Sequence, residues 1–366
     1  MKFAVPIFLA ICLFFPATGA FAQAKFVYGS PAPIKGPEAQ AIIQYFDQVE
    51  KAAGGSLKIE RTFDGQVVQA RATLPGVRDG LVDASFVYDT FFTTELKSSM
   101  VVTDLAMISG HPLALAGAIN EVFLLNCPPC DADFSRVKVR PVAYNGVAPF
   151  YLLSRNPVSS INDLKGKSIR AASAFAVFSK AMGATPVSIV PAEVYEAMQR
   201  GAVDGAITGG VWLRSYNLWD VAKYIVDLPL GQYNSSALFM AGVNSWKSLS
   251  AAHKKLMVDR LPFLVAEATL NHIKETKEVL EEAGRKGVKM SPVPADFKSF
   301  VEKYRQGEPQ RAVNDGKNKG VEKADLLVKA FTEKLAKWEK IVGEVGDNRP
   351  KYEEALRAEI FNKVKW

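Results

Sequence analysis

The sequence predicts an α/β protein with two lobes and long helices at its C-terminal end. Segments of strand and helix character alternate through much of the chain, which favours mostly parallel sheets flanked by helices. A helix end, a Gly and then Val-Asp before an apolar strand occur twice, at 76–84 and at 197–205. After Leu249 the pattern becomes helical. We therefore expect two related lobes with helices packed on them.

The first lobe is expected to begin with a strand, a helix and a second strand. Residues 26–28 are β-prone, and Pro37 suits the first turn of a helix that ends at Gly54-Gly55. The apolar residues of that helix fall on one face: Ala39, Ile42, Phe46, Val49 and Ala53. Apolar residues alternate across 57–63, which predicts the second strand.

The C-terminal third is expected to be helical. Ser250 is a candidate N-cap for a long segment that runs to Gly284, with Pro262 as its start, kink or break. Further on, one apolar stripe at helical spacing predicts a helix packed on the body: Leu327, Phe331, Leu335, Trp338 and Val342. No Gly/Ser-rich linker separates independent domains, so the chain is expected to cross between the lobes more than once.

These patterns give expected boundaries for each part of the chain. We expect a signal peptide at 1–22, a first lobe at 23–147 with parts of 234–275, a second lobe at 148–233 with parts of 276–320, and helices packed on the body at 321–366.

The first 22 residues have the pattern of a cleaved export signal. Lys2 precedes an apolar stretch at 3–15, and Ala-Phe-Ala at 20–22 has the small-x-small pattern of a signal-peptidase site. The apolar run is shorter than the roughly 20 residues of a spanning helix, and Cys12 follows a bulky Ile rather than the small residue of a lipoprotein signal. We therefore expect cleavage after Ala22 and a periplasmic protein.

Composition and motifs argue against several functional classes. Hydrophobic residues make up 48% and charged residues 23%, which is the balance of a globular chain. Although the net charge is +7, no Arg/Lys patch with interleaved aromatics occurs, so nucleic acid is not an expected partner. The sequence contains no G-x-S-x-G, H-E-x-x-H or Walker motif, and its three histidines lie in no catalytic motif. We expect neither an enzyme nor a cofactor.

Two acidic residues end the repeated turns. Asp83 and Asp204 each precede an apolar strand, where a short acidic side chain commonly hydrogen-bonds to nearby backbone. We expect local hydrogen bonds from them rather than a catalytic carboxylate pair. His272, within a helical segment, is expected to be an ordinary packed or surface residue.

Cleavage of the signal would leave Cys127 and Cys130, in Cys-Pro-Pro-Cys, as the two cysteines. A local disulfide, expected to stiffen a surface loop, is the favoured interpretation for an exported protein. A thioredoxin-type redox pair is a second possibility, because C-x-x-C is its motif. A metal site is the weakest, since no histidine clusters with the pair.

The central segment carries an ordered series of short motifs. Asp-Leu-Lys-Gly-Lys-Ser-Ile-Arg at 163–170 is a polar turn that runs into a short strand ending at Arg170. Further motifs follow at 183–187, 191–199, 201–205 and 219–224. The series resembles the DctP-like solute-binding subunits of tripartite ATP-independent periplasmic (TRAP) transporters, closely over 163–224 and loosely over most of the chain.

This resemblance implies a two-lobed periplasmic binding protein, type II-like, whose cleft closes on a small organic acid. In that family the Arg that ends this strand forms a bidentate salt bridge with the ligand carboxylate, which here assigns Arg170. From the strand alone, a surface Arg at the end of an edge strand is an equal alternative. The implied partners are the organic acid and the small and large membrane subunits of a TRAP permease.

The sequence also departs from the family pattern. Where many relatives have Asn-Pro after the Val-Asp-Gly strand, this chain has Thr208, and the second Arg of sugar-acid and dicarboxylate binders is missing at 146–151. We therefore expect a monocarboxylate with an aromatic or apolar body. The candidate lining residues are Thr208, Trp212, Tyr88, Phe91, Tyr151 and Phe175, although some of these rings are equally expected in the core.

Two other functions remain open at the level of sequence. One is an exported thiol–disulfide oxidoreductase built on Cys127 and Cys130. The other is the binding protein of an ATP-driven importer, which shares the lobed architecture but not the central series of motifs.

Overall fold

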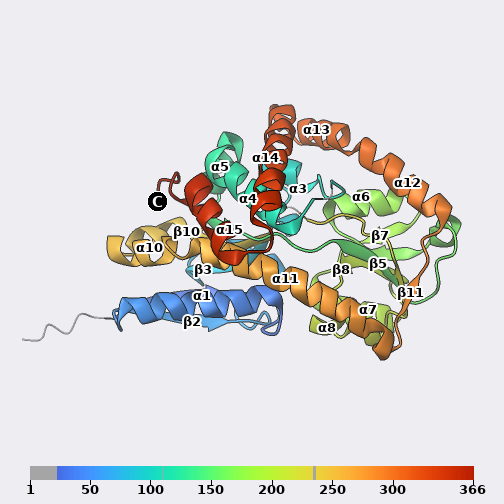
Figure 1. Cartoon of the computed structure of the whole chain (residues 1–366), viewed down its shortest axis with the longest axis horizontal. Coiled ribbons are helices and arrows are strands. Elements are labelled where there is room, and N and C mark those ends of the chain that lie inside the picture. The colour runs from blue at the N-terminus through green and yellow to red at the C-terminus, as the bar shows by residue number, and fades with distance from the viewer. Residues whose placement is uncertain (1–22, 109, 234–235) are drawn as a thin grey trace, which may run out of the picture.

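The computed structural model describes residues 23–108, 110–233 and 236–366 of the chain. Two β-sheets with helices around them form two lobes, and helices of the C-terminal third run across both (Figure 1). The predicted signal peptide and its Cys12 lie outside the described residues.

The sheet of the first lobe has the strand order β2-β1-β3-β10-β4. Its strands are β1 (Ala24–Gly29), β2 (Leu57–Thr62), β3 (Ala84–Tyr88), β4 (Val139–Tyr144) and β10 (Ser236–Gly242). Strand β1 pairs in parallel with β2 and β3, whereas β10 is antiparallel to β3 and β4. The helices of this lobe are α1 (Pro37–Ala53), α2 (Thr73–Arg78), α3 (Lys97–Thr103), α4 (Pro112–Leu125) and α5 (Pro128–Arg136).

The sheet of the second lobe has the strand order β11-β9-β5-β8-β6-β7. Its strands are β5 (Phe150–Ser154), β6 (Ser168–Arg170), β7 (Thr185–Val187), β8 (Gly205–Gly209), β9 (Tyr224–Val226) and β11 (Lys289–Ser291). Its helices are α6 (Ser173–Ala181), α7 (Val194–Gln199) and α8 (Trp212–Ser215). Strand β5 is antiparallel to β8 and β9, while the other pairs are parallel.

Both sheets are mixed, which corrects the expectation of mostly parallel sheets. The antiparallel strands are β5 and β10, the first strands that follow a crossing from one lobe to the other. The chain also crosses to the second sheet before β11, but β11 is parallel to its neighbour β9. The predicted repeated crossing is confirmed.

The repeated Val-Asp turn has the same structural role in both lobes. Asp83 accepts a hydrogen bond from the backbone N–H of Val27 on β1 (2.7 Å), and Asp204 accepts one from Ser168 N–H on β6 (2.9 Å). Each carboxylate ties its turn to the neighbouring strand, as expected for acidic residues at turn exits. The internal repeat in the sequence therefore corresponds to the same turn in each lobe, held to the neighbouring strand by an Asp carboxylate.

The remaining helices follow the predicted pattern. They are α9 (Val243–Ser248), α10 (Ala251–Val258), α11 (Leu261–Ala283), α12 (Ala295–Gln306), α13 (Glu308–Asn318), α14 (Ala324–Val345) and α15 (Arg349–Leu356). The Ser250 hydroxyl caps α10 by accepting from His253 N–H (3.1 Å), and Pro262 lies in the first turn of α11, so the long segment is broken there.

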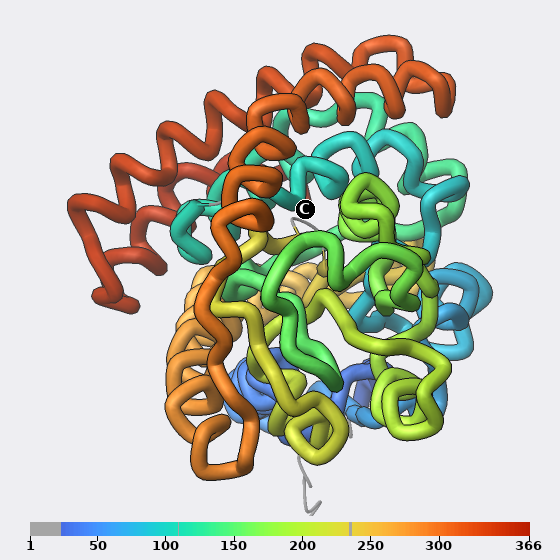
Figure 2. Tube along the Cα trace, turned by 90° about the vertical axis from the view of Figure 1, so that its right-hand side faces the viewer, coloured from blue at the N-terminus to red at the C-terminus, as the bar shows by residue number. Residues whose placement is uncertain are grey.

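Two arrangements of these helices matter for the site. Helix α11 runs from the first lobe to the second (Figure 1). Helices α13 and α14 pack on α3 and α4, seen from the second lobe in Figure 2. The predicted apolar stripe of α14 is buried in this contact.

No single helix among residues 23–108, 110–233 and 236–366 has the length and apolar character of a membrane span. Helices α4 and α5, which meet at an angle of 71°, together have the length and apolar composition of a bent span, but α4 is buried at nearly all of its positions inside the first lobe.

Candidate functional site

A cavity lies between the two lobes and takes its walls from both of them. The first lobe contributes the N-terminal end of α1 and the C-terminal end of β3, and the second contributes the end of β6 and helix α8. The segments that cross between the sheets and the middle of α11 complete the wall. Together with its open mouth the cavity contains about 740 Å³ of space.

The guanidinium group of Arg170 lies in the wall of this cavity. Its Nε and Nη2 donate to the carbonyl of Ile189 (3.2 and 3.1 Å), and its Nη1 lies 3.5 Å from the carbonyl of Ile207. The residue is 3% exposed, and burial lowers its pKa from the ordinary value. No carboxylate of the described residues lies within ion-pair distance of Arg170. The cavity therefore holds a buried, rigidly positioned cation with donors left for a ligand.

Aromatic side chains surround this cation. The Trp212 ring lies 4.8 Å from the guanidinium carbon and contacts Tyr216 edge to face at 5.1 Å. Tyr88 and Phe91, from the first lobe, form a second edge-to-face pair at 6.1 Å. Tyr233 lies on the crossing from β9 to β10 and donates its hydroxyl to the carbonyl of Ala172. These rings give the cavity apolar walls with polar edges.

Glu38 and His272 form a second polar group in the cavity wall. Glu38 lies in the first turn of α1, and its Oε1 is 3.5 Å from Nε2 of His272 on α11. The His272 Nδ1 accepts a hydrogen bond from Ala148 N–H (3.1 Å), so its ring proton belongs on Nε2, toward Glu38. Burial lowers the pKa of His272 to about 4 and raises the pKa of Glu38 to about 7. The imidazole is therefore neutral, and the carboxyl titrates near neutral pH.

Four of the predicted ligand residues line this cavity: Arg170, Trp212, Tyr88 and Phe91. Three others do not. Tyr151 and Thr208 are cross-strand neighbours on β5 and β8, and both are buried within the second lobe. Phe175 is fully buried and stacks on Phe150 at 5.5 Å, behind the part of the wall that Phe150 forms. Both faces of this sheet are covered, so a residue near a strand end does not automatically reach the cavity.

Sequence reasoning missed Glu38, Tyr216 and Tyr233 and gave His272 no role at the site. An acidic residue in the first turn of a helix is common for electrostatic reasons, so Glu38 carried no signal of a binding role. His272 is a packed residue as expected, but it is packed against the cavity. Glu38 and His272 meet because α1 packs against α11.

Cys127 and Cys130 form a disulfide, with their Cα atoms 5.2 Å apart. Cys127 caps the N-terminal end of α5 and Cys130 lies in its first turn, so the pair does not lie in the expected surface loop. The two residues are 1% and 0% exposed and do not line the cavity. A buried disulfide of this kind is inaccessible to a protein substrate. Within the described residues, no group of three or more Cys, His, Asp or Glu side chains is placed to hold a metal ion.

Two lobes with a cavity between them are the architecture of periplasmic binding proteins. The family model of the bacterial extracellular solute-binding proteins, family 7 (DctP), matches residues 29–307, which is more than half of the chain. The chain belongs to this family, as the resemblance of its central motifs predicted.

Solved structures share the fold at low sequence identity. DctP6, a Bordetella pertussis extracytoplasmic solute receptor binding pyroglutamic acid, superposes with a TM-score of 0.74 at 14% identity and covers 85% of this chain and 100% of its own. A TRAP periplasmic solute-binding protein of Bordetella bronchiseptica with bound mandelate gives 0.73 at 19% identity, over 86% of this chain and 99% of its own.

Curated relatives match shorter segments. The ectoine-binding periplasmic protein TeaA of Halomonas elongata is 29% identical over 124 residues, which cover 33% of this chain and 36% of TeaA. A solute-binding protein of Albidiferax ferrireducens is 25% identical over 191 residues, covering 51% and 54%. The chain thus spans about half or less of the length of the curated relatives that it matches.

Proposed function

We propose that this protein is the extracytoplasmic receptor of a TRAP transporter and captures a monocarboxylate with an aromatic or apolar body. It would deliver this ligand to the small and large membrane subunits of the permease. The observation that carries the proposal is the buried Arg170 guanidinium, which lies in the cavity without a carboxylate partner among the described residues.

The energetics of Arg170 favour an anionic ligand. A buried guanidinium loses hydration, and its hydrogen bonds to carbonyl groups replace that hydration without neutralising the charge. Three of its five N–H groups have carbonyl contacts, which leaves two N–H groups for a planar acceptor. A carboxylate matches this fork and supplies the missing charge. One fixed cation suits one carboxylate, so a dianion would bury a second, unpaired charge.

The walls support an apolar body for the ligand. Trp212, Tyr88 and Phe91 present ring surfaces to the cavity, and burying such surface against a ligand ring contributes through the hydrophobic effect. Two of the structurally similar receptors bind mandelate and pyroglutamic acid, which are small monocarboxylic acids. These observations support the monocarboxylate class.

The mechanism follows from the origin of the lining residues. Arg170 and Trp212 belong to the second lobe, whereas Tyr88 and Phe91 belong to the first. A ligand that contacts both lobes binds the closed arrangement more tightly than the open one and shifts the population toward closure. We propose that the permease recognises this closed form.

Titration calorimetry on Arg170 variants tests the proposal. A thermal-shift panel of mandelate, benzoate, 2-oxo acids, pyroglutamate, succinate and sialic acid first selects the ligand. Arg170→Ala should then weaken binding by about 3 kcal/mol, or more than a hundredfold, and Arg170→Lys should restore only part of it.

Arg200→Ala is the matched control, since Arg200 is exposed and forms an exposed ion pair with Glu196 one helical turn away. It should leave affinity unchanged. Near-native affinity in Arg170→Ala, or strongest stabilisation by succinate or sialic acid, would contradict the proposal.

A further inference from the structure

Glu38 gives the cavity a second recognition group. We infer that the ligand carries a hydrogen-bond donor, a hydroxyl or N–H group, in addition to its carboxylate, and that Glu38 accepts this donor. The inference rests on the proposed function, in which Arg170 holds the ligand carboxylate. It names the polar group that distinguishes the ligand from a simple apolar acid.

The position of Glu38 makes it available to a ligand. It lines the cavity from the first turn of α1, with 16% of its side-chain surface exposed. Arg170 lines the same cavity from the end of β6 in the other lobe. A ligand held by Arg170 therefore faces a wall that contains a carboxyl group.

Glu38 lacks a cationic partner of its own. Among the described residues, the one basic side chain within ion-pair distance is His272, which is neutral because burial lowers its pKa to about 4. The other titratable groups that influence Glu38 or are influenced by it are Tyr28 on β1, Tyr88 on β3, Tyr216 after α8 and Glu275 on α11. None of these groups carries positive charge. A hydrogen-bond donor on the ligand would give the Glu38 carboxylate a partner in place of the cation that the described residues do not provide.

The orientation of His272 favours acceptance over donation by Glu38. Because Nδ1 of His272 accepts from Ala148 N–H, the ring proton is on Nε2, so the nitrogen that lies 3.5 Å from Glu38 Oε1 is a donor and not an acceptor. A ligand acceptor at the same place would require Glu38 to bind a proton, whereas a ligand donor leaves the carboxylate intact. Charge-assisted hydrogen bonds are the stronger kind, so the donor should raise affinity by about tenfold to a hundredfold.

The alternative is that Glu38 serves only the helix. A negative charge in the first turn of α1 interacts favourably with the helix dipole, whatever the cavity contains. In that case Glu38 variants would change stability but would treat ligands with and without a donor alike. Matched ligand pairs separate the two roles.

The test measures affinity for acids that differ only in the donor. Mandelate is compared with phenylacetate, which lacks the hydroxyl, and pyroglutamate with 3-oxocyclopentane-1-carboxylate, which has CH2 in place of the N–H and keeps the ring carbonyl. The same comparison is made for the tightest acid of the thermal-shift panel and its analogue without the donor. In the wild type at pH 8, whichever pair of acids binds the protein, the acid with the donor should bind at least tenfold more tightly than its analogue without the donor.

Variants and pH then assign the effect to Glu38. Glu38→Ala should abolish the difference between the paired acids. Glu38→Asp keeps the charge near the helix terminus but shortens the side chain, so it should lose much of the difference while keeping stability. Because burial raises the pKa of Glu38 to about 7, the difference should shrink from pH 8 to pH 6 in the wild type and not in Glu38→Gln.

The outcomes distinguish this inference from the proposed function. Equal affinity of the paired acids in the wild type, a tightest ligand without a donor, or an undiminished difference in Glu38→Ala would overturn the role of Glu38 alone. Undiminished binding in Arg170→Ala would overturn the proposed carboxylate anchor instead. Weakening of more than a hundredfold in Arg170→Ala, together with selective loss of the donor effect in Glu38→Ala, supports both.

Discussion

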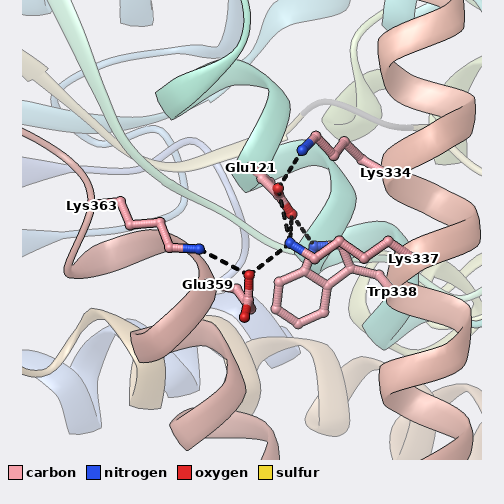
Figure 3. A network of polar contacts seen from close by, with 6 residues as sticks. All are labelled: Glu121, Lys334, Lys337, Trp338, Glu359 and Lys363. Atoms are coloured by element: carbon pink, nitrogen blue, oxygen red, sulfur yellow. Dashed lines mark hydrogen bonds and ion pairs between the residues drawn. The ribbon is translucent and has the colours of Figure 1, made fainter.

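Replacing Glu121 with Gln should destabilise the protein without changing ligand affinity. Glu121 lies on α4 and is 4% exposed, and its carboxylate joins α4 to the long helix α14 (Figure 3). It accepts hydrogen bonds from Lys334 Nζ (2.6 Å), Lys337 Nζ (2.8 Å) and Trp338 Nε1 (2.8 Å). Lys337 also pairs with Glu359 (2.8 Å), so the C-terminal residues belong to the same network.

The size of the effect follows from these contacts. Gln keeps one oxygen for Trp338 but turns an amide toward two ammonium groups. A hydrogen bond to a charged group contributes about 1.5–3 kcal/mol, and breaking a fully buried pair costs about 3–5 kcal/mol. Lys334 and Lys337 are 27% and 33% exposed and regain part of their hydration. We therefore expect the free energy of unfolding to fall by about 2–3 kcal/mol.

Urea unfolding followed by circular dichroism measures this change. Glu333→Gln is the control, because Glu333 lies on α14 next to Lys334 but forms an exposed pair with Lys329, and its replacement should cost at most about 0.5 kcal/mol. Equal stability of the two variants would refute the reasoning.

The difference in unfolding free energy between the wild type and Glu121→Gln should depend on pH. Burial alone would raise the pKa of Glu121, but hydrogen bonds from Lys334, Lys337 and Trp338 outweigh burial and lower it below 4.5. The stabilisation is therefore present above the unfolded pKa and is lost as pH falls through the folded pKa. The difference between wild type and Glu121→Gln should narrow in acid.

Three further predictions concern other parts of the molecule. Burial lowers the pKa of His272 from 6.5 to about 4, so the wild type should lose up to about 3 kcal/mol as pH falls from 6.5 to 4, and His272→Gln should lose less in acid unfolding curves. Cys127→Ser with Cys130→Ser should lower the melting temperature only modestly, because the disulfide closes a short loop, and the wild type should show no insulin-reduction activity. Finally, N-terminal sequencing of periplasmic protein should begin at Gln23; retention of Cys12 would contradict export with cleavage.

The local elements of the fold could be predicted because their signals are local. Pro37 and Gly54 bound α1, and Ser250 and Pro262 mark the starts of α10 and α11, since caps and prolines act within one helical turn. Strand direction was not predictable in the same way. Strands β5 and β10 are antiparallel to their neighbours, whereas β11, which the chain also enters from the other lobe, is parallel to β9, and no local sequence pattern records these directions.

The site residues also differ in whether a local sequence signal indicates them. Arg170 could be assigned because a family motif delivers it at the end of a strand, and Tyr88 follows the same logic in the first lobe. Thr208 also lies near a strand end, but β8 runs between β5 and β6 and both of its faces are covered. Glu38 and His272 lie on helices that are far apart in the sequence, α1 and α11, and the packing of these two helices brings them together.

The origins of Arg170 and Glu38 link selectivity to closure. If each lobe contributes one polar anchor, a ligand that satisfies only Arg170 stabilises the closed arrangement less than one that satisfies both. The lobes already contact each other near Arg170, where Asp104, which follows α3, accepts a hydrogen bond from Ser173 at the start of α6 and pairs with Lys319 (3.3 Å). Such ligand-independent contacts reduce the energy that the ligand must supply for closure. A ligand donor that binds Glu38 of the first lobe, while the carboxylate binds Arg170 of the second, would add its binding energy only when the lobes are closed. It would therefore stabilise the closed form relative to the open form.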